Sequence, residues 1–322
     1  METVLCFDLS HTGIVVVTYN SAGVIEKCLD SCGALPVVVV DNASQDNTRE
    51  LVGSRANVKL IGNRSNRGFA AAVNQGVAEL DTDLILLLNP DVELETPLDA
   101  MERSCRENGF GIAGGKLVNQ TGSVQVGFAV RRFPTPLALI FEVLGINRLF
   151  PWNGVNRRYR CFDLDLSKPA EIDQPPGALL LFRRDVWQTL GGFDTQFRPL
   201  WFEDVDFCRR TRNLGVRIQY VPEVIGRHRG GHSIAGLDWV QREVFWYVSL
   251  LRYASKHFPP YAYRGVGAAV VLGSLLRSVI GVLRWRSLRP LRVYAKIAKF
   301  AAGSIVCGRV GEGDLLGVMA RP

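Results

Sequence analysis

The sequence predicts an α/β fold in which a mostly parallel, Rossmann-like sheet is flanked by helices, with a helical appendage at the C-terminal end. Three observations support this fold class. Short apolar runs without polar alternation are typical of strands buried on both faces of a sheet. These runs alternate with helical patterns, which favours right-handed crossovers between parallel strands. The last quarter of the chain instead combines long apolar stretches with basic residues.

Short strands and capped helices alternate in the first part of the chain. Ser21 can cap the first helix, and Gly33 and Pro36 end it. Pro90 follows the fourth strand, whose five residues are all apolar. We expect strands at residues 14–18, 37–40, 58–61 and 84–88, and helices at residues 22–31, from 44 or 46 to 55, and 69–80.

The pattern becomes looser in the second part of the chain. Residues 120–173 are rich in Gly, Pro, Arg and aromatic residues and predict a long irregular segment, a feature that is often functional in compact domains. The residues of this segment indicate no particular chemistry. Further strands are expected near residues 112–113 and at 178–182 and 217–221, with helices that end at residues 190 and 213.

Polar residues follow three of the expected strands. They are Thr18-Tyr19-Asn20, Asp41-Asn42 and Asn89-Pro90-Asp91. The carboxyl ends of parallel strands meet at one edge of a sheet, so these clusters predict a single pocket. A carboxylate at residue 91, directly after a proline, is well placed to bind a divalent cation. The chain has neither Gly-x-Gly-x-x-Gly after the first strand nor a P-loop sequence, which argues against a dinucleotide-dependent oxidoreductase and a P-loop enzyme.

Two further segments contain candidate functional residues. In Asn66-Arg67-Gly68, the glycine allows the backbone to approach a ligand and Arg67 could reach a diphosphate, although simple helix packing explains the segment equally well. Glu203, Asp204 and Asp206 follow Trp201 at the start of a helix, a denser acidic cluster than capping requires. The helix dipole would keep Asp204 ionised, as a general base must be.

The basic residues are concentrated at the C-terminal end. Residues 244–311 contain eleven Lys or Arg and no Asp or Glu, whereas residues 1–243 carry a net charge of −3. Arg277 interrupts the apolar run of residues 265–283, which favours a shallow interfacial helix over a membrane span. Between residues 284 and 299, basic residues alternate with large apolar ones, which is typical of contact with an anionic membrane. Nucleic-acid binding is less favoured, because phosphate tracking needs no bulky aliphatic residues.

The domain boundary is placed where this charge change occurs. Residues 1–243 form one domain, with a first part at about 12–118 and a second at about 119–243, and residues 244–322 form a membrane-associating region. The seven cysteines are scattered and predict a reducing compartment. Cys28 and Cys32 are one helical turn apart, which suits helix packing. Residues 1–11 lack the pattern of a signal peptide.

Seven segments resemble, in order, the motifs of family 2 glycosyltransferases, and are most similar to bacterial rhamnosyltransferases that act on lipid-linked saccharides. The resemblance covers about residues 12–235. The segments are Val17-Thr18-Tyr19-Asn20, Val40-Asp41-Asn42-Ala43-Ser44 with Asp46, Asn66-Arg67-Gly68-Phe69 with Asn74, Leu88-Asn89-Pro90-Asp91, Gly191-Gly192-Phe193-Asp194, Glu203-Asp204-Val205-Asp206 and His228-Arg229-Gly230-Gly231-His232-Ser233.

The resemblance implies a GT-A fold, a nucleoside-diphosphate-sugar donor, a divalent cation (Mg²⁺ or Mn²⁺) and inversion at the anomeric carbon. In this fold, residues of about 12–118 would form the donor part and about 119–243 the acceptor part. It implies that Asp204 is the catalytic base. Asp91 and His228 would bind the metal, with His232 as an alternative to His228. Glu203, Asp206 and Trp201 would lie on the acceptor side or orient the base. The implied donor-binding residues are Thr18, Tyr19, Asn20, Asp41, Asn42, Asn66, Arg67, Gly68 and Asn89, the last of which replaces the first acid of the family's Asp-x-Asp motif.

These expectations define the functional hypothesis. The protein would transfer a sugar, with L-rhamnose from dTDP-rhamnose as the leading donor, to a polyprenyl-diphosphate-linked or other glycan acceptor in cell-wall or surface-polysaccharide synthesis. It would work at the cytoplasmic face of a bacterial inner membrane, bound peripherally or shallowly, without nucleic acid, and a homo-oligomer is left open. The alternatives are a UDP-sugar donor, a nucleotidyltransferase or a non-catalytic sugar-nucleotide-binding membrane protein. A nucleotidyltransferase would need a basic residue near the first strand, and residues 14–22 contain none.

Overall fold

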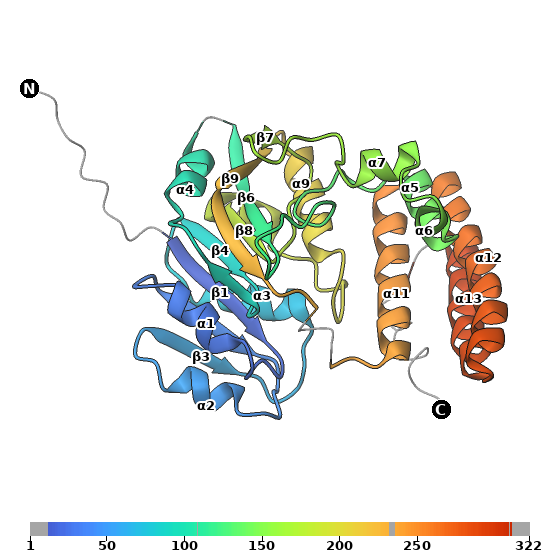
Figure 1. Ribbon diagram of the computed structural model, residues 1–322, viewed down its shortest axis with the longest axis horizontal. Helices are drawn as coiled ribbons and strands as arrows, with labels where there is room; N and C mark the ends of the chain where they lie inside the picture. The colour runs from blue at the N-terminus through green and yellow to red at the C-terminus, as the bar shows by residue number, and fades with distance from the viewer. Residues whose placement is uncertain (1–11, 108, 232–235, 309, 311–322) are drawn as a thin grey trace, which may run out of the picture.

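The structure is a computed structural model that describes residues 12–107, 109–231, 236–308 and 310. Within these residues the strands form one nine-stranded sheet in the order β3-β2-β1-β4-β8-β6-β9-β5, with β7 paired to β9 (Figure 1). The strands are β1 (Thr12–Thr18), β2 (Val37–Asp41), β3 (Val58–Gly62), β4 (Leu84–Leu88), β5 (Val92–Leu94), β6 (Phe110–Val118), β7 (Ala170–Glu171), β8 (Leu179–Arg183) and β9 (Arg217–His228).

Helices cover the sheet and continue beyond it. They are α1 (Ile25–Ser31), α2 (Thr48–Gly53), α3 (Phe69–Ala78), α4 (Asp99–Arg106), α5 (Pro136–Val143), α6 (Ile146–Leu149), α7 (Gly154–Tyr159), α8 (Arg184–Leu190), α9 (Glu203–Asn213), α11 (Trp239–His257), α12 (Pro260–Trp285) and α13 (Arg289–Cys307). Figure 1 shows α11, α12 and α13 grouped at one end of the molecule, beside the sheet domain.

The sheet is parallel in one half and mixed in the other. β1 pairs in parallel with β2 and β4, and β2 with β3. β8 runs antiparallel to both of its neighbours, and β5 and β7 run antiparallel to β9. β6 and β9 pair in parallel and run in the same direction as β1–β4, so the expected α/β fold with a mostly parallel sheet is confirmed, and β5, β7 and β8 are the antiparallel strands. The chain reaches β8 through the long segment after β6 instead of a simple helical crossover. Such a connection does not require β8 to run parallel to its neighbours.

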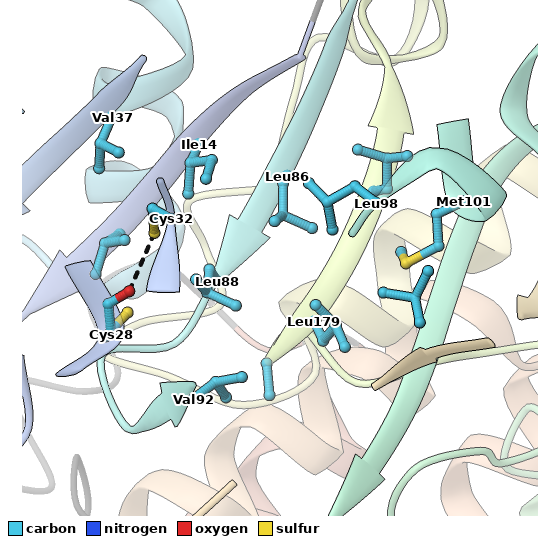
Figure 2. Close-up of a cluster of buried hydrophobic side chains, with 14 of the residues drawn as sticks. Ile14, Cys28, Cys32, Val37, Leu86, Leu88, Val92, Leu98, Met101 and Leu179 are labelled. Atoms are coloured by element: carbon cyan, nitrogen blue, oxygen red, sulfur yellow. Dashed lines mark hydrogen bonds between the residues drawn. The ribbon is translucent and has the colours of Figure 1, made fainter. Parts of the chain in front are cut away.

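Both faces of the central strands are buried, as the all-apolar runs predict. Along β1, Ile14 and Val16 pack on one face and Val15 and Val17 on the other, because successive side chains alternate across a strand. Figure 2 shows the first of these faces, where strand side chains meet helices α1 and α4. There Cys32 Sγ lies 3.2 Å from the carbonyl oxygen of Cys28, one turn earlier in the chain. The two cysteines therefore serve helix packing, as expected.

The segment expected to be irregular contains three short helices. Thr135 caps α5, with Pro136 at the first helical position, and Asn153 caps α7. These helices have only four to eight residues. Such lengths are too short to give a clear helical period in the sequence. The expectation of irregular structure is therefore wrong for this part of the segment.

The C-terminal helices share an apolar core with the sheet domain. Asp238 and Gln241 form a capping box at the start of α11. The predicted boundary at residue 243 consequently falls inside this helix. α11 is buried along one side, where Val248 and Tyr253 pack in the same cluster as Phe202 of the segment before α9. This first helix is therefore part of the domain core.

The segment expected to lie on a membrane is not one amphipathic element. α12 ends at Trp285, the next residue, Arg286, has a φ of 48°, and α13 begins at Arg289. Val293, Tyr294 and Ile297 are buried against α11 and α12 instead of facing outward. These three residues therefore stabilise the helical core, whereas Trp285, Leu288 and Leu291 of the same segment are exposed, and membrane contact by this segment stays a prediction.

Candidate active site

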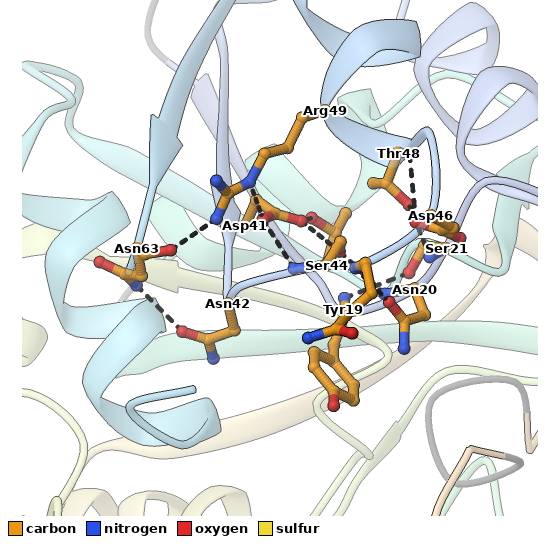
Figure 3. A network of polar contacts seen from close by, with 12 residues as sticks. Tyr19, Asn20, Ser21, Asp41, Asn42, Ser44, Asp46, Thr48, Arg49 and Asn63 are labelled. Carbon is orange, nitrogen blue, oxygen red and sulfur yellow. Dashed lines mark hydrogen bonds and ion pairs between the residues drawn. The ribbon is translucent and has the colours of Figure 1, made fainter. Parts of the chain in front are cut away.

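The polar ends of β1 and β2 form one hydrogen-bonded network (Figure 3). Asp41 is fully buried, and its Oδ2 accepts a hydrogen bond from Thr18 Oγ1 at 3.0 Å. Its Oδ1 accepts from the Ser44 backbone N–H at 3.0 Å and pairs with Arg49 Nε at 2.5 Å. The parallel pairing sets Thr18 directly beside Asp41. The network therefore holds this carboxylate in a single orientation.

Asn20 and Asn42 fix the loops that follow the same strands. Asn20 has a φ of 52°; its N–H donates to Ser44 Oγ at 2.8 Å, and its Oδ1 accepts from the Gln45 N–H at 2.7 Å. Asn42 Oδ1 accepts from Asn63 Nδ2 at 2.9 Å. Figure 3 shows the ring of Tyr19 pointing away from the network. These two loops, together with residues 89–92, are called the strand-end edge below.

The loop before α3 lies against another loop of the protein. Gly68 has a φ of 88°, and a Cβ atom at this position would lie 3.2 Å from the Pro199 carbonyl oxygen. The close approach that requires glycine is therefore to the chain itself rather than to a ligand. Asn66 Oδ1 accepts from the Gly68 N–H at 2.9 Å, and Arg67 is exposed.

Asn74, which belongs to one of the family motifs, is hydrogen-bonded to the backbone of Phe193. Its side chain exchanges two hydrogen bonds with the backbone of Phe193, at 2.8 and 2.9 Å. These bonds attach α3 to the Gly191-Gly192-Phe193-Asp194 turn. Two of the sequence motifs therefore stabilise each other.

Asp91 and His228 are brought together by strand pairing. β5 begins at Val92, whose register partner on β9 is His228. The Nε2 atom of His228 lies 3.5 Å from Asp91 Oδ1, and both residues are buried. The expected metal pair, 137 positions apart in the sequence, thus forms one small site. His232, the alternative ligand, lies outside the described residues.

Gln125, which the sequence did not single out, orients His228. Its Nε2 donates to the carbonyl oxygen of His228 at 2.9 Å, so its Oε1 accepts from His228 Nδ1 at 2.9 Å. A proton on Nδ1 leaves Nε2 as an acceptor that faces Asp91. Metal-binding histidines commonly have such a partner on the second nitrogen. Phe128 stacks on the same ring, with centroids 5.3 Å apart and an interplanar angle of 14°.

This pair fits part of a divalent-cation site. Neighbouring ligands of an octahedral cation lie about 3 Å apart when each is about 2.1 Å from the ion, which is close to the observed 3.5 Å. No cluster of three or more His, Cys, Asp or Glu side chains suited to a metal occurs in the described part of the chain. Mg²⁺ typically uses one or two carboxylates together with substrate phosphates. The residues therefore fit a cation that a bound diphosphate helps to hold, with Asn89 next to the site at the end of β4.

Asp204 is positioned beside this edge by a short backbone connection. The Gly177 N–H donates to Asp204 Oδ2 at 2.9 Å, and the Val205 N–H donates to Oδ1 at 2.8 Å. The residue after Gly177, Ala178, accepts a hydrogen bond from the Asn89 N–H at 3.0 Å. The carboxylate at the start of α9 is therefore tied to the end of β4.

The acidity of Asp204 differs from the expectation based on the helix dipole alone. Burial raises the pKa of Asp204 above its usual 3.8, although the N–H groups of Gly177 and Val205 oppose the shift. Burial, followed by the charge of Asp204, raises the pKa of Glu203 well above 4.5. Glu203 Oε2 is buried and has no hydrogen-bond partner among the described residues. A base with a raised pKa binds a proton more strongly, which suits proton abstraction near neutral pH.

Asp206 lies in a cluster of ion pairs between two helices. Its carboxylate pairs with Arg210 Nε at 2.7 Å, His257 Nε2 at 2.7 Å and Lys256 Nζ at 2.8 Å. Burial alone would raise the pKa of Asp206, but the hydrogen bond to His257 and the two cations outweigh it and lower the pKa. Asp206 therefore joins α9 to α11 and lies outside the cavity described next, and its expected role as an acceptor-side or orienting acid stays a prediction.

A cavity of about 270 Å³ opens next to Asp204. Its wall comes from several distant segments and includes Trp201, one of the candidate site residues. The wall residues used below are Phe128, Arg131, Gln174, Trp201 and Trp246, and they are called the cavity wall. Phe128 also stacks on His228, so it separates the candidate metal pair from the cavity. Asp204 thus lies between the strand-end edge and a partly open cavity that could hold a small ligand.

Several residues of this site had no sequence motif to indicate them. Gln125, Phe128 and Arg131 lie in the segment after β6, and Trp246 lies on α11. The Asp41 partner Arg49 lies on α2 and could have been found as the basic residue nearest the second strand end.

Comparison with known proteins identifies the family. The profile of glycosyl transferase family 2 matches residues 13–189. An N-acetylglucosaminyl-diphospho-decaprenol L-rhamnosyltransferase of Mycobacterium tuberculosis is 29% identical over 243 residues, which cover 68% of this chain and 76% of the relative. The rhamnosyltransferase WbbL of Escherichia coli is 24% identical over 233 residues, which cover 68% of this chain and 84% of the relative.

A solved structure shares the fold. The mannosyltransferase PcManGT of Pyrobaculum calidifontis, in complex with GDP-mannose and Mn²⁺, superposes with a TM-score of 0.51 at 18% identity. The superposition covers 92% of this chain and 87% of that one. This likeness concerns the fold and confirms the GT-A architecture predicted from the sequence. Because the family profile spans more than half of the chain, the protein belongs to glycosyl transferase family 2.

Proposed function

We propose that this glycosyltransferase transfers a sugar, with inversion, from a nucleoside-diphosphate donor to a lipid-linked saccharide. L-Rhamnose from dTDP-rhamnose is the leading donor, because the two curated relatives described above are named as rhamnosyltransferases. The M. tuberculosis relative is named for a diphospho-decaprenol-linked sugar, which supports a polyprenyl-diphosphate acceptor. The observation that carries the proposal is the position of Asp204 between the strand-end edge and the cavity.

Asp204 supplies the proton acceptor for the reaction. As the acceptor hydroxyl attacks the anomeric carbon, its proton passes to the carboxylate of Asp204, and the bond to the donor diphosphate breaks. Direct attack from the side opposite the diphosphate inverts the anomeric configuration. The N–H groups of Gly177 and Val205 hold the carboxylate in place for this step.

Asp91 and His228 would hold the divalent cation, Mg²⁺ or Mn²⁺, together with the donor diphosphate. When bound, such a cation neutralises negative charge on the departing diphosphate. Thr18 and Asp41 form the rigid side of the nucleoside pocket, and Arg49 keeps the Asp41 carboxylate fixed. This chain's residues therefore bind and orient the donor at one side of Asp204.

A transfer assay tests the proposal. The full-length protein is incubated with dTDP-rhamnose, UDP-N-acetylglucosamine or GDP-mannose, with Mn²⁺ or Mg²⁺, and with membrane lipid extract as the acceptor source. We expect transfer from dTDP-rhamnose that stops when the cation is chelated, and a product whose anomeric configuration, measured by NMR, is opposite to that of the donor. Retention of configuration would contradict the single-base mechanism. Transfer only from another donor would show that L-rhamnose is not the transferred sugar. Donor binding without turnover would support the non-catalytic alternative.

The exposed side of α12 supports membrane association. Among the described helices, α12 alone is long and apolar enough to cross a membrane by length and composition, although 39% of its most apolar window is buried. Arg277 turns inward and donates to the carbonyl oxygens of Val143 and Glu142. The outward face, called the apolar stripe, follows the spacing of one helix side. It comprises Leu272, Leu275, Leu276, Val279, Ile280 and Leu283.

We place this apolar stripe on the cytoplasmic surface of an anionic membrane. Exposed Arg284, Arg286, Arg289 and Arg292 continue from its end and would contact lipid phosphates. Since the other side of α12 packs against α5 and α13, surface substitutions test the contact better than a truncation. This arrangement favours peripheral or shallow insertion over a full span.

Vesicle flotation tests the membrane contact. Substitution of Leu276, Ile280 and Leu283 by Asn should abolish flotation with vesicles that contain anionic lipid. Leu214→Asn, which changes an exposed leucine directly after α9, should have no effect. If the triple variant floats like the wild type, the stripe is not the membrane contact. If it instead changes the molecular mass in solution, the stripe is a subunit interface.

A further inference from the structure

The cavity next to Asp204 contains a buried polar atom that the protein does not satisfy. Gln174 is 5% exposed, and its Oε1 has no hydrogen-bond partner among the described residues. Buried side-chain acceptors are normally hydrogen-bonded, because leaving them unpaired is costly. Gln174 lines the cavity. Its Oε1 is therefore an acceptor that a hydroxyl or amide N–H of a ligand can satisfy.

Arg131 lies beside Gln174 and is held rigidly. The two residues exchange backbone hydrogen bonds in an antiparallel bridge, at 3.0 and 3.1 Å. Directly opposed residues in such a bridge place their side chains on the same face, about 5 Å apart at Cβ. The Arg131 guanidinium lies 5.8 Å from the ring centroids of both Phe128 and Tyr159. Both side chains thus line one cavity, and the two rings limit the motion of the arginine.

The guanidinium of Arg131 still has donors available. Among the described residues its side chain makes one hydrogen bond, from Nε to the Gly127 carbonyl oxygen at 2.8 Å. Its two terminal nitrogens donate no hydrogen bond to any of the described residues. Arg160, which also lines the cavity, already has an acidic partner, since its Nη2 lies 3.5 Å from Glu142. A planar guanidinium with free donors is suited to phosphate.

We propose that this cavity binds the sugar–phosphate head of the acceptor, with Gln174 Oε1 accepting a hydrogen bond from the sugar and Arg131 pairing with the phosphate. The inference rests on the proposed function, since it assigns the acceptor subsite of that reaction. The volume of about 270 Å³ is just below the usual range for small-molecule pockets and suits one sugar ring. A sugar seated there has a hydroxyl beside Asp204, and its phosphate extends toward Arg131. The segment at residues 125–131 therefore contributes to both substrate sites. Gln125 orients the metal pair that would hold the donor diphosphate, and Arg131 binds the acceptor phosphate.

Two matched probes separate the roles of the two residues. One is N-acetylglucosamine linked to an octyl diphosphate, and the other is the uncharged octyl glycoside of the same sugar. Binding to the full-length protein is measured by calorimetry. We expect the wild type to bind the diphosphate probe about 10- to 100-fold more tightly, the range for hydrogen bonds to a charged group. Arg131→Gln should remove this preference, and Arg131→Lys, which keeps the charge but not the planar fork, should restore part of it.

Gln174→Leu should weaken both probes by about tenfold, because it removes a contact to the sugar. Arg132→Gln is the matched control. This neighbouring arginine pairs with Asp163 at 2.9 Å and lies outside the cavity wall, so neither affinity should change. Thermal unfolding of each variant confirms that it is folded.

The results have separate meanings for the two proposals. Equal affinity of the wild type for both probes, absence of binding, or an unchanged preference in folded Arg131→Gln would overturn the acceptor subsite. Unchanged binding in folded Gln174→Leu would remove the role of Gln174. If the wild type binds the probes as expected but transfers no sugar from any donor, the proposed function fails instead.

Discussion

The strand-end edge and the cavity wall are built in different ways. The edge consists of loops that directly follow β1, β2 and β4, and its network joins residues that neighbouring strands already place side by side, such as Thr18 and Asp41. The wall combines Phe128, Gln174 and Trp246 from three separate segments, one of them on α11. Strand topology therefore positions the strand-end edge, whereas long-range packing positions the cavity wall. Changes in the two regions should therefore have different consequences.

Substitution of Asp204, at the border of the two regions, should have the largest effect on the reaction rate. Asp204→Asn keeps the size of the side chain but removes the base, so kcat should fall about 10²- to 10⁴-fold. The Kd for the nucleotide donor, measured by calorimetry, should stay within a few fold of the wild-type value. A variant that keeps more than about a tenth of the wild-type kcat would show that another group accepts the proton.

Asp206 tests the packing that supports the cavity wall. Asp206→Ala leaves the mostly buried Arg210 without its carboxylate partner, whereas Lys256 keeps its ion pair with Asp194, so the free energy of unfolding should fall by roughly 3 kcal/mol. Because the pKa of Asp206 is lowered, its stabilisation is present above pH 3.8 and is lost as the pH falls through the folded-state pKa. Urea denaturation between pH 3 and pH 7 measures both effects. An unchanged unfolding midpoint at pH 7 would show that this cluster does not hold the two helices together.

Gln125 tests the link between the two regions. Gln125→Leu removes the hydrogen bond that orients His228, so the affinity for Mn²⁺ in the presence of a nucleoside diphosphate should fall about 10- to 100-fold. The affinity for the nucleoside diphosphate without metal should not change. Equal loss with and without Mn²⁺ would indicate a general disturbance of the loop. Val126→Leu, a change at the exposed neighbouring residue, is the control.

Glu203 gives the smallest effect, visible mainly in stability. Since its pKa is raised in the folded protein, the folded state binds the proton more strongly than the unfolded state. The resulting stabilisation is complete below pH 4.5 and is lost as the pH rises through the folded-state pKa. Glu203→Gln should therefore be more stable than the wild type at pH 8, with a difference that shrinks as the pH falls. Urea denaturation at several pH values checks this, and a pH-independent difference would contradict it.

The difference between the regions also explains what could be predicted from the sequence. The first four strands and the polar residues at their ends follow from short-range patterns, so the position of Thr18, Asp41 and Asp91 at one edge of the sheet could be predicted before the structure. The antiparallel direction of β8 and the helices at 136–159 could not, because they depend on distant contacts. Gln174 could not be recognised either, since only the pairing with Arg131 places it in the cavity.

The apparent roles of residues also change with tertiary contacts. Asp206 belongs to the same acidic cluster as Asp204, yet the cations of α9 and α11 surround its carboxylate. Val293 and Ile297 have the spacing of a membrane-facing surface, yet they pack inside the helical core. In both cases the sequence pattern showed correctly which residues lie on the same helix face. It did not show what packs against that face, because helical periodicity carries no information about the neighbouring element.

Hydrogen–deuterium exchange tests most directly whether the two regions bind different substrates. The protein is compared with and without Mn²⁺ and the nucleoside diphosphate of the preferred donor. We expect slower exchange at residues 18–21, 41–44 and 226–229, which belong to the strand-end edge and the candidate metal pair, and no change at residues 154–162 and in α11. Slower exchange in α11 and residues 154–162, without any change at 41–44, would contradict the separation of donor and acceptor sites at Asp204.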